Sequence, residues 1–113
     1  MHMEKPKVGF EEFQKIEIKV GKVKEAYKIE GSKKLLRVLI DLGKDGVKQA
    51  IAGISKYYTP ESLIGKTVIV VTNLEPKTMM GYTSEVMLLA AFNETDLSLL
   101  TTDKEMPPGT PVS

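Results

Sequence analysis

Residue types that support catalysis or metal binding are scarce in this 113-residue chain. It contains no cysteine and a single histidine, His2. The absence of cysteine excludes disulfides, thiolate metal sites and cysteine nucleophiles together. A transition-metal site would have to use carboxylates alone, and Ser55 and Ser84 have no internal histidine to activate them. We therefore expect a non-catalytic protein with no metal ligands and no cofactor, and we interpret His2 as part of an N-terminal arm.

Long apolar runs are also missing. No segment approaches the length needed to cross a bilayer, and the polar N-terminus MHMEKPKVGF does not have the pattern of a signal peptide. The hydrophobic fraction of 42% and the charged fraction of 27% are typical of an ordinary globular protein. We expect one cytoplasmic domain over residues 1–113, with residues 1–8 as a loose arm.

A strong net charge of either sign is absent too, since the formal total is +1. Its distribution is uneven: residues 15–48 contain ten basic and five acidic residues, whereas residues 75–105 contain two basic and six acidic ones. A basic half permits a phosphate-binding surface on a nearly neutral molecule. A solvated surface crossed by salt bridges fits the same pattern, so charge alone does not decide between them.

Alternating apolar residues predict β-strands in the first half of the chain. A short helical turn over residues 10–13 precedes residues 16–20, in which apolar and polar positions alternate as in a half-buried strand. The apolar phase slips at Gly21, which predicts a β-bulge there and a bent strand that continues to about Tyr27. A second alternating strand is predicted over residues 36–42.

The second half contains clear turn and cap signals. Asp45-Gly46 is a hairpin turn signal, and Thr59-Pro60 has the pattern of a helix start, with Gly65 as its end. Three further strands are predicted, over residues 47–53, 66–72 and 85–92.

Five strands with a short helix between the third and the fourth predict an all-β fold, a five-stranded oligonucleotide- and oligosaccharide-binding (OB) barrel. The apolar segment 97–100 and the proline-rich tail 107–111 are extensions of this barrel. An apolar strand with no place in the barrel is expected to pair with something else, such as a second copy of the chain.

The most informative segment is 73–91, NLEPKTMMGYTSEVMLLAA. Pro76 cannot continue a strand, so a glycine-containing loop separates the fourth strand from the fifth. In an OB barrel this loop and the loop between the first two strands flank the ligand-binding face. Each lysine or arginine near these loops, taken singly, is consistent with an ordinary solvated surface charge. Their convergence on one rim instead favours binding of single-stranded or loop nucleic acid.

Other side chains in this region allow two interpretations. Met79 and Met80 fit either an adaptable apolar contact for a base or a plug at the barrel end. Met87 fits the core and the site equally well. Tyr57 and Tyr58 are expected to pack beside the predicted helix and not to act as stacking platforms.

Several short motifs, in this order and spacing, resemble the tRNA-binding domain family. That family includes the C-terminal domain or separate β-subunit of methionyl-tRNA synthetases, free-standing dimeric tRNA-binding proteins, C-terminal modules of eukaryotic synthetase cofactors and the CsaA secretion chaperone. The resemblance covers roughly residues 10–112. The matching elements are Phe13, Ile18-Lys19-Val20-Gly21-Lys22-Val23, Lys34-Leu35, Asp41-Leu42-Gly43, Ala52-Gly53, Leu63-Ile64-Gly65-Lys66, Asn73 to Pro76, Ser84 to Met87 and Pro108-Gly109.

The resemblance implies a barrel that recognises tRNA by shape and that forms a homodimer through its terminal extensions. Two departures from the family pattern are Glu75, where a lysine is usual, and Ala52, where a serine is common. The positions that match the binding motif are Lys34, Asn73, Lys77, Ser84 and Met87, with Lys19, Lys33 and Arg37 as further phosphate contacts.

We therefore expect an accessory tRNA-binding module, free-standing or the β-subunit of a methionyl-tRNA synthetase. The alternatives are a CsaA-like export chaperone that binds peptides at an apolar groove near Met79-Met80, and a purely structural dimerisation subunit.

Overall fold

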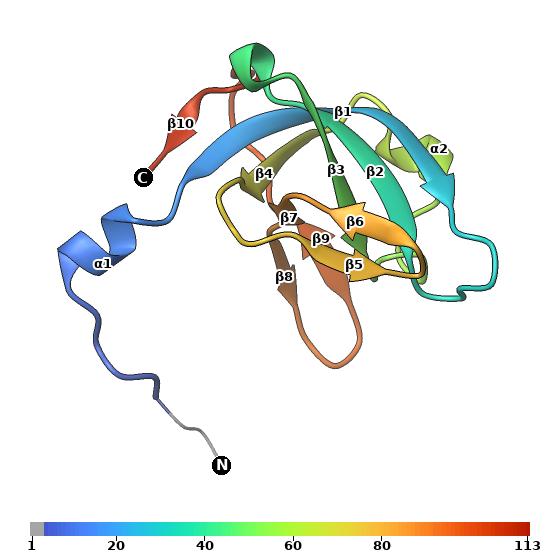
Figure 1. The fold of residues 1–113 in the computed structure, drawn as a ribbon, viewed down its shortest axis with the longest axis horizontal. Helices are drawn as coiled ribbons and strands as arrows, with labels where there is room; N and C mark the ends of the chain where they lie inside the picture. Colours follow the sequence, from blue (N-terminus) through green and yellow to red (C-terminus); the bar gives the residue numbers. More distant parts are fainter. Residues whose placement is uncertain (1–3) are drawn as a thin grey trace.

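Five antiparallel strands form a nearly closed barrel in the computed structural model, which describes residues 4–113 (Figure 1). The strand order is β3-β2-β1-β4-β7, and it confirms the predicted all-β OB barrel. His2 lies outside the described residues. The barrel strands are β1 (Ile18–Lys28), β2 (Leu36–Asp41), β3 (Val47–Ala52), β4 (Thr67–Val71) and β7 (Met87–Leu88).

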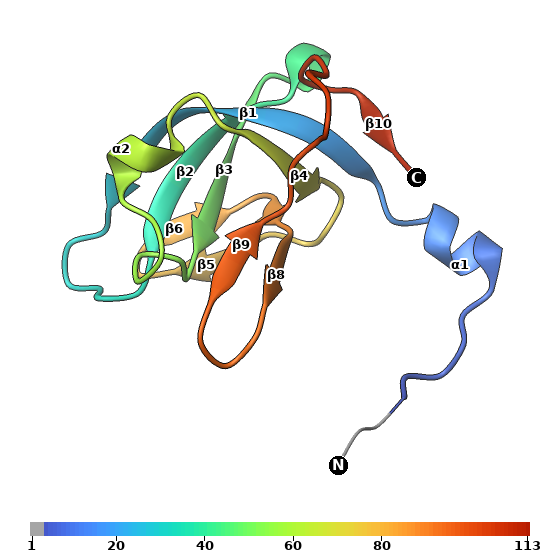
Figure 2. The same ribbon diagram turned by 180° about the vertical axis from the view of Figure 1, so that it is seen from behind.

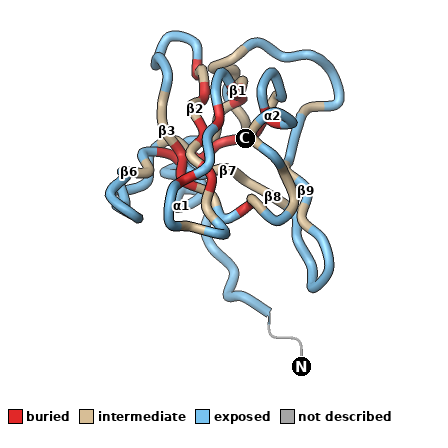
Figure 3. Tube along the Cα trace, turned by 90° about the vertical axis from the view of Figure 1, so that its right-hand side faces the viewer, coloured by how far each residue is buried: buried red, intermediate tan, exposed pale blue. Residues whose placement is uncertain are grey.

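The barrel interior is filled by one face of each alternating strand. In β2, Leu36, Val38 and Ile40 are fully buried, whereas Arg37 and Asp41 on the opposite face remain partly exposed. The buried residues concentrate inside the barrel, and the peripheral hairpins and loops are mostly exposed (Figure 3).

A short helix packs against one end of the barrel, as the sequence predicts. In α2 (Pro60–Leu63), the Thr59 hydroxyl accepts from the Ser62 amide at 3.2 Å, and the Ser62 hydroxyl accepts from the Thr59 amide at 3.1 Å. These two bonds form a reciprocal N-terminal cap. Leu63 is fully buried in the core, so the cap holds a core residue in place.

The remaining elements lie outside the barrel or extend it. Residues 4–9 and α1 project away from the barrel, while β10 lies beside the start of β1 (Figure 1). Within residues 4–113 no helix has the length and apolar character needed to cross a membrane. These elements are α1 (Phe10–Gln14), η1 (Gly43–Asp45), β5 (Lys77–Met79), β6 (Tyr82–Ser84), β8 (Ala90–Phe92), β9 (Leu97–Leu99) and β10 (Pro111–Val112).

The predicted β-bulge at Gly21 is wrong. Gly21 pairs in regular register with Val68, and the register shift against β2 lies between Val23 and Glu25. Gly21 is required for a different reason: a Cβ at this position would overlap with Cγ2 of Ile40 in the core. The glycine therefore permits a close approach of β1 to a neighbouring side chain.

The single fifth strand predicted over residues 85–92 is also wrong. Its first part, β7, pairs with β4, whereas β8 pairs with β9 in a separate hairpin that Figure 2 shows from behind. Leu89 is the point of change: its amide donates to the Ile69 carbonyl at 2.9 Å, and its carbonyl accepts from the Leu100 amide at 3.0 Å. The apolar segment 97–100 thus finds its pairing partner within the same chain, and β9 does not need a second copy for this purpose.

Candidate nucleic-acid interface

The predicted loop between the fourth and fifth strands is a β-hairpin, β5–β6, that is tied to β3. Gln49 Nε2 donates to the Thr83 carbonyl at 2.8 Å, and the Ile51 amide donates to Ser84 Oγ at 3.0 Å. The Ser84 hydroxyl in turn donates to the Val86 carbonyl at 3.0 Å. These bonds close the barrel between β3 and β7 and hold the hairpin over the β2–β3 face, which is the ligand-binding face of OB barrels.

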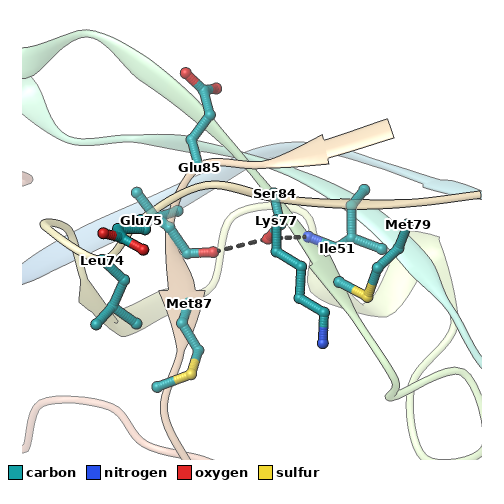
Figure 4. A pocket seen from close by; sticks show the side chains of 9 residues that line it. Ile51, Leu74, Glu75, Lys77, Met79, Ser84, Glu85 and Met87 are labelled. Carbon is teal, nitrogen blue, oxygen red and sulfur yellow. Dashed lines mark hydrogen bonds between the residues drawn. The ribbon is translucent and has the colours of Figure 1, made fainter. Parts of the chain in front are cut away.

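An open pocket of about 300 Å³ lies beneath this hairpin (Figure 4). Its volume is at the lower end of the range for small-molecule sites. Apolar side chains dominate its lining, and polar groups stand at its edge. The lining residues are Ile51, Leu74, Glu75, Lys77, Met79, Ser84, Glu85, Val86 and Met87.

The tip of the hairpin touches the loop between β1 and β2. A Cβ at Gly31 would lie 3.5 Å from Cε of Met80. Two loops that are about fifty residues apart in the chain therefore meet at one rim of the barrel. Of the two predicted roles for Met79 and Met80, the structure places Met79 in the pocket lining and Met80 in the contact between the loops.

Arg37 occupies the centre of the barrel face between two tyrosines. Its guanidinium carbon lies 5.4 Å from the ring centroids of both Tyr27 and Tyr82, which are 42% and 37% exposed. Its Nε donates to Gln49 Oε1 at 2.7 Å, which fixes the guanidinium plane. Partial burial, together with the nearby Glu25, raises the pKa of Tyr27 above its ordinary value. Exposed aromatic rings beside a cation are the groups that bind unstacked bases.

Sequence reasoning missed Tyr27 as a site residue and included Tyr82 only as part of a loop. Tyr27 follows the buried Ala26, so alternation places it on the outer face. Its importance comes from being directly opposite Arg37 in the β1–β2 register. The alternation was visible in the sequence, but the register of the pair was not.

Three of the predicted cations are exposed and free of salt bridges within residues 4–113, namely Lys33, Lys34 and Lys77. Lys33 and Lys34 lie in the β1–β2 loop, where the Ser55 hydroxyl and amide donate to their carbonyls at 2.6 and 3.1 Å. The loop is therefore anchored, while its ammonium groups remain available for phosphates.

The structure does not bring Lys19 to this rim. Its ammonium contacts Asp45 at 2.5 Å and Glu17 at 3.9 Å, and Asp45 lies beyond the far end of β2 from Arg37. The hydrogen bond to Asp45 raises the pKa of Lys19 and lowers that of Asp45. The charge of Lys19 is thus already balanced within the chain.

Asn73 and Ser84 have structural bonds that the motif did not reveal. Asn73 Oδ1 accepts from the Glu17 amide at 2.7 Å, and its Nδ2 donates to the Lys15 carbonyl at 2.6 Å, which attaches the start of β1 to the end of β4. The Ser84 hydroxyl bridges Ile51 and Val86, as described above. Both side chains therefore position the segments that carry the pocket.

Carboxylates in the described part of the chain do not form a metal centre. No group of three or more histidine, cysteine, aspartate or glutamate residues within positions 4–113 is close enough to hold a metal ion. Glu75 and Glu85 line the pocket edge, but Glu85 Oε1 accepts from the Gln49 amide at 3.0 Å. Figure 4 shows the Glu85 side chain pointing away from Lys77 and Met87.

Residues 18–111 match the protein family described as "Putative tRNA binding domain". The chain belongs to the tRNA-binding domain family. It is 50% identical over 107 residues to a methionine–tRNA ligase of Methanocella arvoryzae and 44% identical over 106 residues to one of Caldanaerobacter subterraneus. These alignments cover 95% and 94% of the chain but 16% of each ligase, so the chain spans about a sixth of the length of these relatives.

Two solved structures with the same fold match over their full length. A chaperone CsaA of Bacillus anthracis is 37% identical with a TM-score of 0.88, and the match covers 96% of this chain and 100% of the other. A MetRS related protein of Pyrococcus horikoshii is 36% identical with a TM-score of 0.89 and the same coverage. The family therefore contains proteins of about this length as well as segments of much longer ligases.

Proposed function

We propose that this chain is a non-catalytic tRNA-binding domain that supplies tRNA affinity to a methionyl-tRNA synthetase, as a free-standing protein or an accessory β-subunit. Family membership and the ligase relatives support this proposal. The observation that carries it is the meeting of two loops at one rim, where Met80 contacts Gly31 beside the Tyr27–Arg37–Tyr82 cluster. Cytoplasmic location is part of the same proposal.

In this interface the exposed cations and the aromatic cluster have different tasks. Lys33, Lys34 and Lys77 contact phosphates, which gives affinity without sequence preference. Arg37 and its two tyrosines contact bases or riboses of unpaired nucleotides. Ser84 and Asn73 hold the surrounding backbone, and Met87 presents its half-exposed thioether to the ligand. Lys19 contributes through barrel structure and not through a phosphate contact.

The test is the salt dependence of tRNA binding, measured by filter binding with total tRNA. Each lost phosphate contact reduces the slope of log affinity against log salt by about 0.9, which is about eightfold in affinity near 0.1 M salt. We expect Lys34→Ala and Lys77→Ala each to show such a loss. Lys104→Ala removes the same charge from an exposed position in the acidic half of the chain and serves as the matched control. Equal binding by all these proteins would contradict the proposed site.

A CsaA-like peptide-binding function is the second candidate, favoured by the likeness to the Bacillus anthracis chaperone and by the methionines in the pocket lining. Methionine-lined surfaces adapt to varied apolar segments. An electrophoretic titration of the chain with total tRNA and, in parallel, with an unfolded peptide separates the two functions. Peptide binding that is insensitive to salt, without tRNA binding, would replace the tRNA proposal.

We further propose that the chain acts as a homodimer, which would present two RNA surfaces and increase avidity. The α1 helix buries none of its own residues, and Phe10 is 72% exposed on it. Val8, Phe13 and Ile16 beside it are also exposed, and a group of exposed apolar residues of this kind marks a protein–protein contact. Gel filtration tests this proposal, and a monomer at micromolar concentration would contradict it.

A further inference from the structure

We propose that the pocket beneath the β5–β6 hairpin receives a single unstacked nucleobase of the RNA and that Glu75 makes guanine the preferred base. This inference rests on the proposed RNA-binding function and assigns a base-specific role to a residue that departs from the family pattern. The juxtaposition that carries it is a carboxylate and an ammonium group, Glu75 and Lys77, on the edge of one apolar pocket.

The pocket has the shape and surface of a base-binding site. Its deepest residues, Ile51 and Val86, are 7% and 4% exposed. Met79 and Met87 add polarizable side walls, and Figure 4 shows the Lys77 side chain extending between them. Thioether and aliphatic groups contact the flat face of a base without demanding one orientation. The pocket also adjoins the Tyr27–Arg37–Tyr82 cluster through Ile51, which pairs with Arg37 in the β2–β3 register.

The pocket edge offers one acceptor and one donor that are not used elsewhere. Within residues 4–113, neither Glu75 nor Lys77 takes part in a salt bridge or a side-chain hydrogen bond. Glu85 differs, because it already accepts from the Gln49 amide. The Ser84 hydroxyl hydrogen is also engaged, by the Val86 carbonyl. A ligand that fits this edge must therefore donate to a carboxylate and accept from an ammonium group.

Guanine meets both demands without bringing a net charge into the pocket. Its N1–H and N2–H groups point in the same direction and can bond both oxygens of the Glu75 carboxylate. Its O6 and N7 atoms accept hydrogen bonds, which Lys77 can donate in addition to its phosphate contact, because an ammonium group has three N–H donors. Adenine and cytosine each offer one exocyclic amine and an adjacent ring acceptor that repels a carboxylate. Uracil offers one N–H between two carbonyl oxygens, so its match is also incomplete.

The experiment compares short uridine oligonucleotides that carry one central guanosine, adenosine or cytidine, together with the all-uridine oligonucleotide, by fluorescence anisotropy at constant salt. A bidentate base contact discriminates by about tenfold, so we expect the guanosine probe to bind about tenfold more tightly than the others. Glu75→Gln replaces the carboxylate with an amide of the same size at an exposed position. It should reduce the ratio of guanosine to adenosine affinity to near one.

The ratio separates base recognition from general charge effects. Removing any carboxylate raises RNA affinity for all probes, so Glu94→Gln, in the β8–β9 turn, is the matched control and should leave the ratio unchanged. If tRNA binds but the four probes bind the wild type equally well, or none of them binds, the guanine inference is wrong while the proposed function stands. If Glu75→Gln retains the wild-type ratio, Glu75 is not the selecting group and the inference is also wrong. Failure of both tRNA and the probes to bind would refute the proposed function and the inference together.

Discussion

Substitution of Ser84 tests whether the β5–β6 hairpin supports the barrel or is only a mobile loop above it. The Ser84→Ala variant removes a hydroxyl that accepts from the Ile51 amide and donates to the Val86 carbonyl, both at 3.0 Å. Ile51 is 7% exposed, so its amide has little access to replacement water. A buried donor left without a partner costs about 1–3 kcal/mol, against a total stability of roughly 5–15 kcal/mol for a domain.

Urea unfolding monitored by circular dichroism measures this change. We expect the free energy of unfolding to fall by about 1–3 kcal/mol with an unchanged denaturant slope, which corresponds to a Tm lower by about 4–12 °C. Ser98→Ala, at an exposed position of β9, is the matched control and should change the free energy by less than about 0.5 kcal/mol. Equal stability of Ser84→Ala and wild type would show that the bridge between β3 and β7 does not support the barrel.

Gly21→Ala should destabilise the fold by about 1–3 kcal/mol in urea unfolding, because the added Cβ overlaps Ile40 Cγ2, whereas Gly9→Ala, with no atom within 4 Å of its Cβ, should not. Asp45 has a lowered pKa, so its stabilising contribution is present above the ordinary carboxylate pKa and is lost as pH falls through the lowered value. Between about pH 4 and about pH 2, the Tm of Asp45→Asn should therefore fall less than that of the wild type. An equal fall in Tm would exclude a stabilising role for the Lys19–Asp45 pair. Tyr82→Ala should weaken binding of single-stranded RNA in fluorescence anisotropy by about 1–3 kcal/mol while Tyr82→Phe retains it, and equal binding by both variants would exclude stacking on this ring.

Strand alternation and cap signals predicted most of the fold, because they depend on residues close together in the chain. The buried positions of β2 and the Thr59 cap of α2 are examples. The bulge was misplaced because Gly21 interrupts the apolar pattern to make room for Ile40, and not to form a bulge. Packing of this kind across the barrel is not visible in a local sequence pattern. The division of the fifth strand at Leu89 was missed for a related reason. Both β7 and β8 are apolar, and only their different partners separate them.

The candidate site was predictable in part. Lys77, Ser84 and Met87, which match the binding motif of the family, line one pocket, while their contact with RNA stays a prediction. The ion pair of Lys19 could not be predicted, because its partner Asp45 lies in the connection between β2 and β3, far from Lys19 in the chain. Tyr27 was missed because its role depends on the register with Arg37. Residues whose significance comes from a distant partner are the ones that sequence patterns overlook.

The bonds that close the barrel also organise the binding surface. Gln49 connects Arg37 to the hairpin, since its Oε1 accepts from the guanidinium and its Nε2 donates to the Thr83 carbonyl. Ser84 connects the pocket floor at Ile51 to the strand that follows. Because these backbone groups are already bonded, RNA binding at the proposed site would need to order only exposed side chains such as Lys77. A surface built in this way loses little conformational entropy on binding, which favours recognition of a preformed RNA shape, and in our proposal the methionines and Glu75 add the local fit to one base.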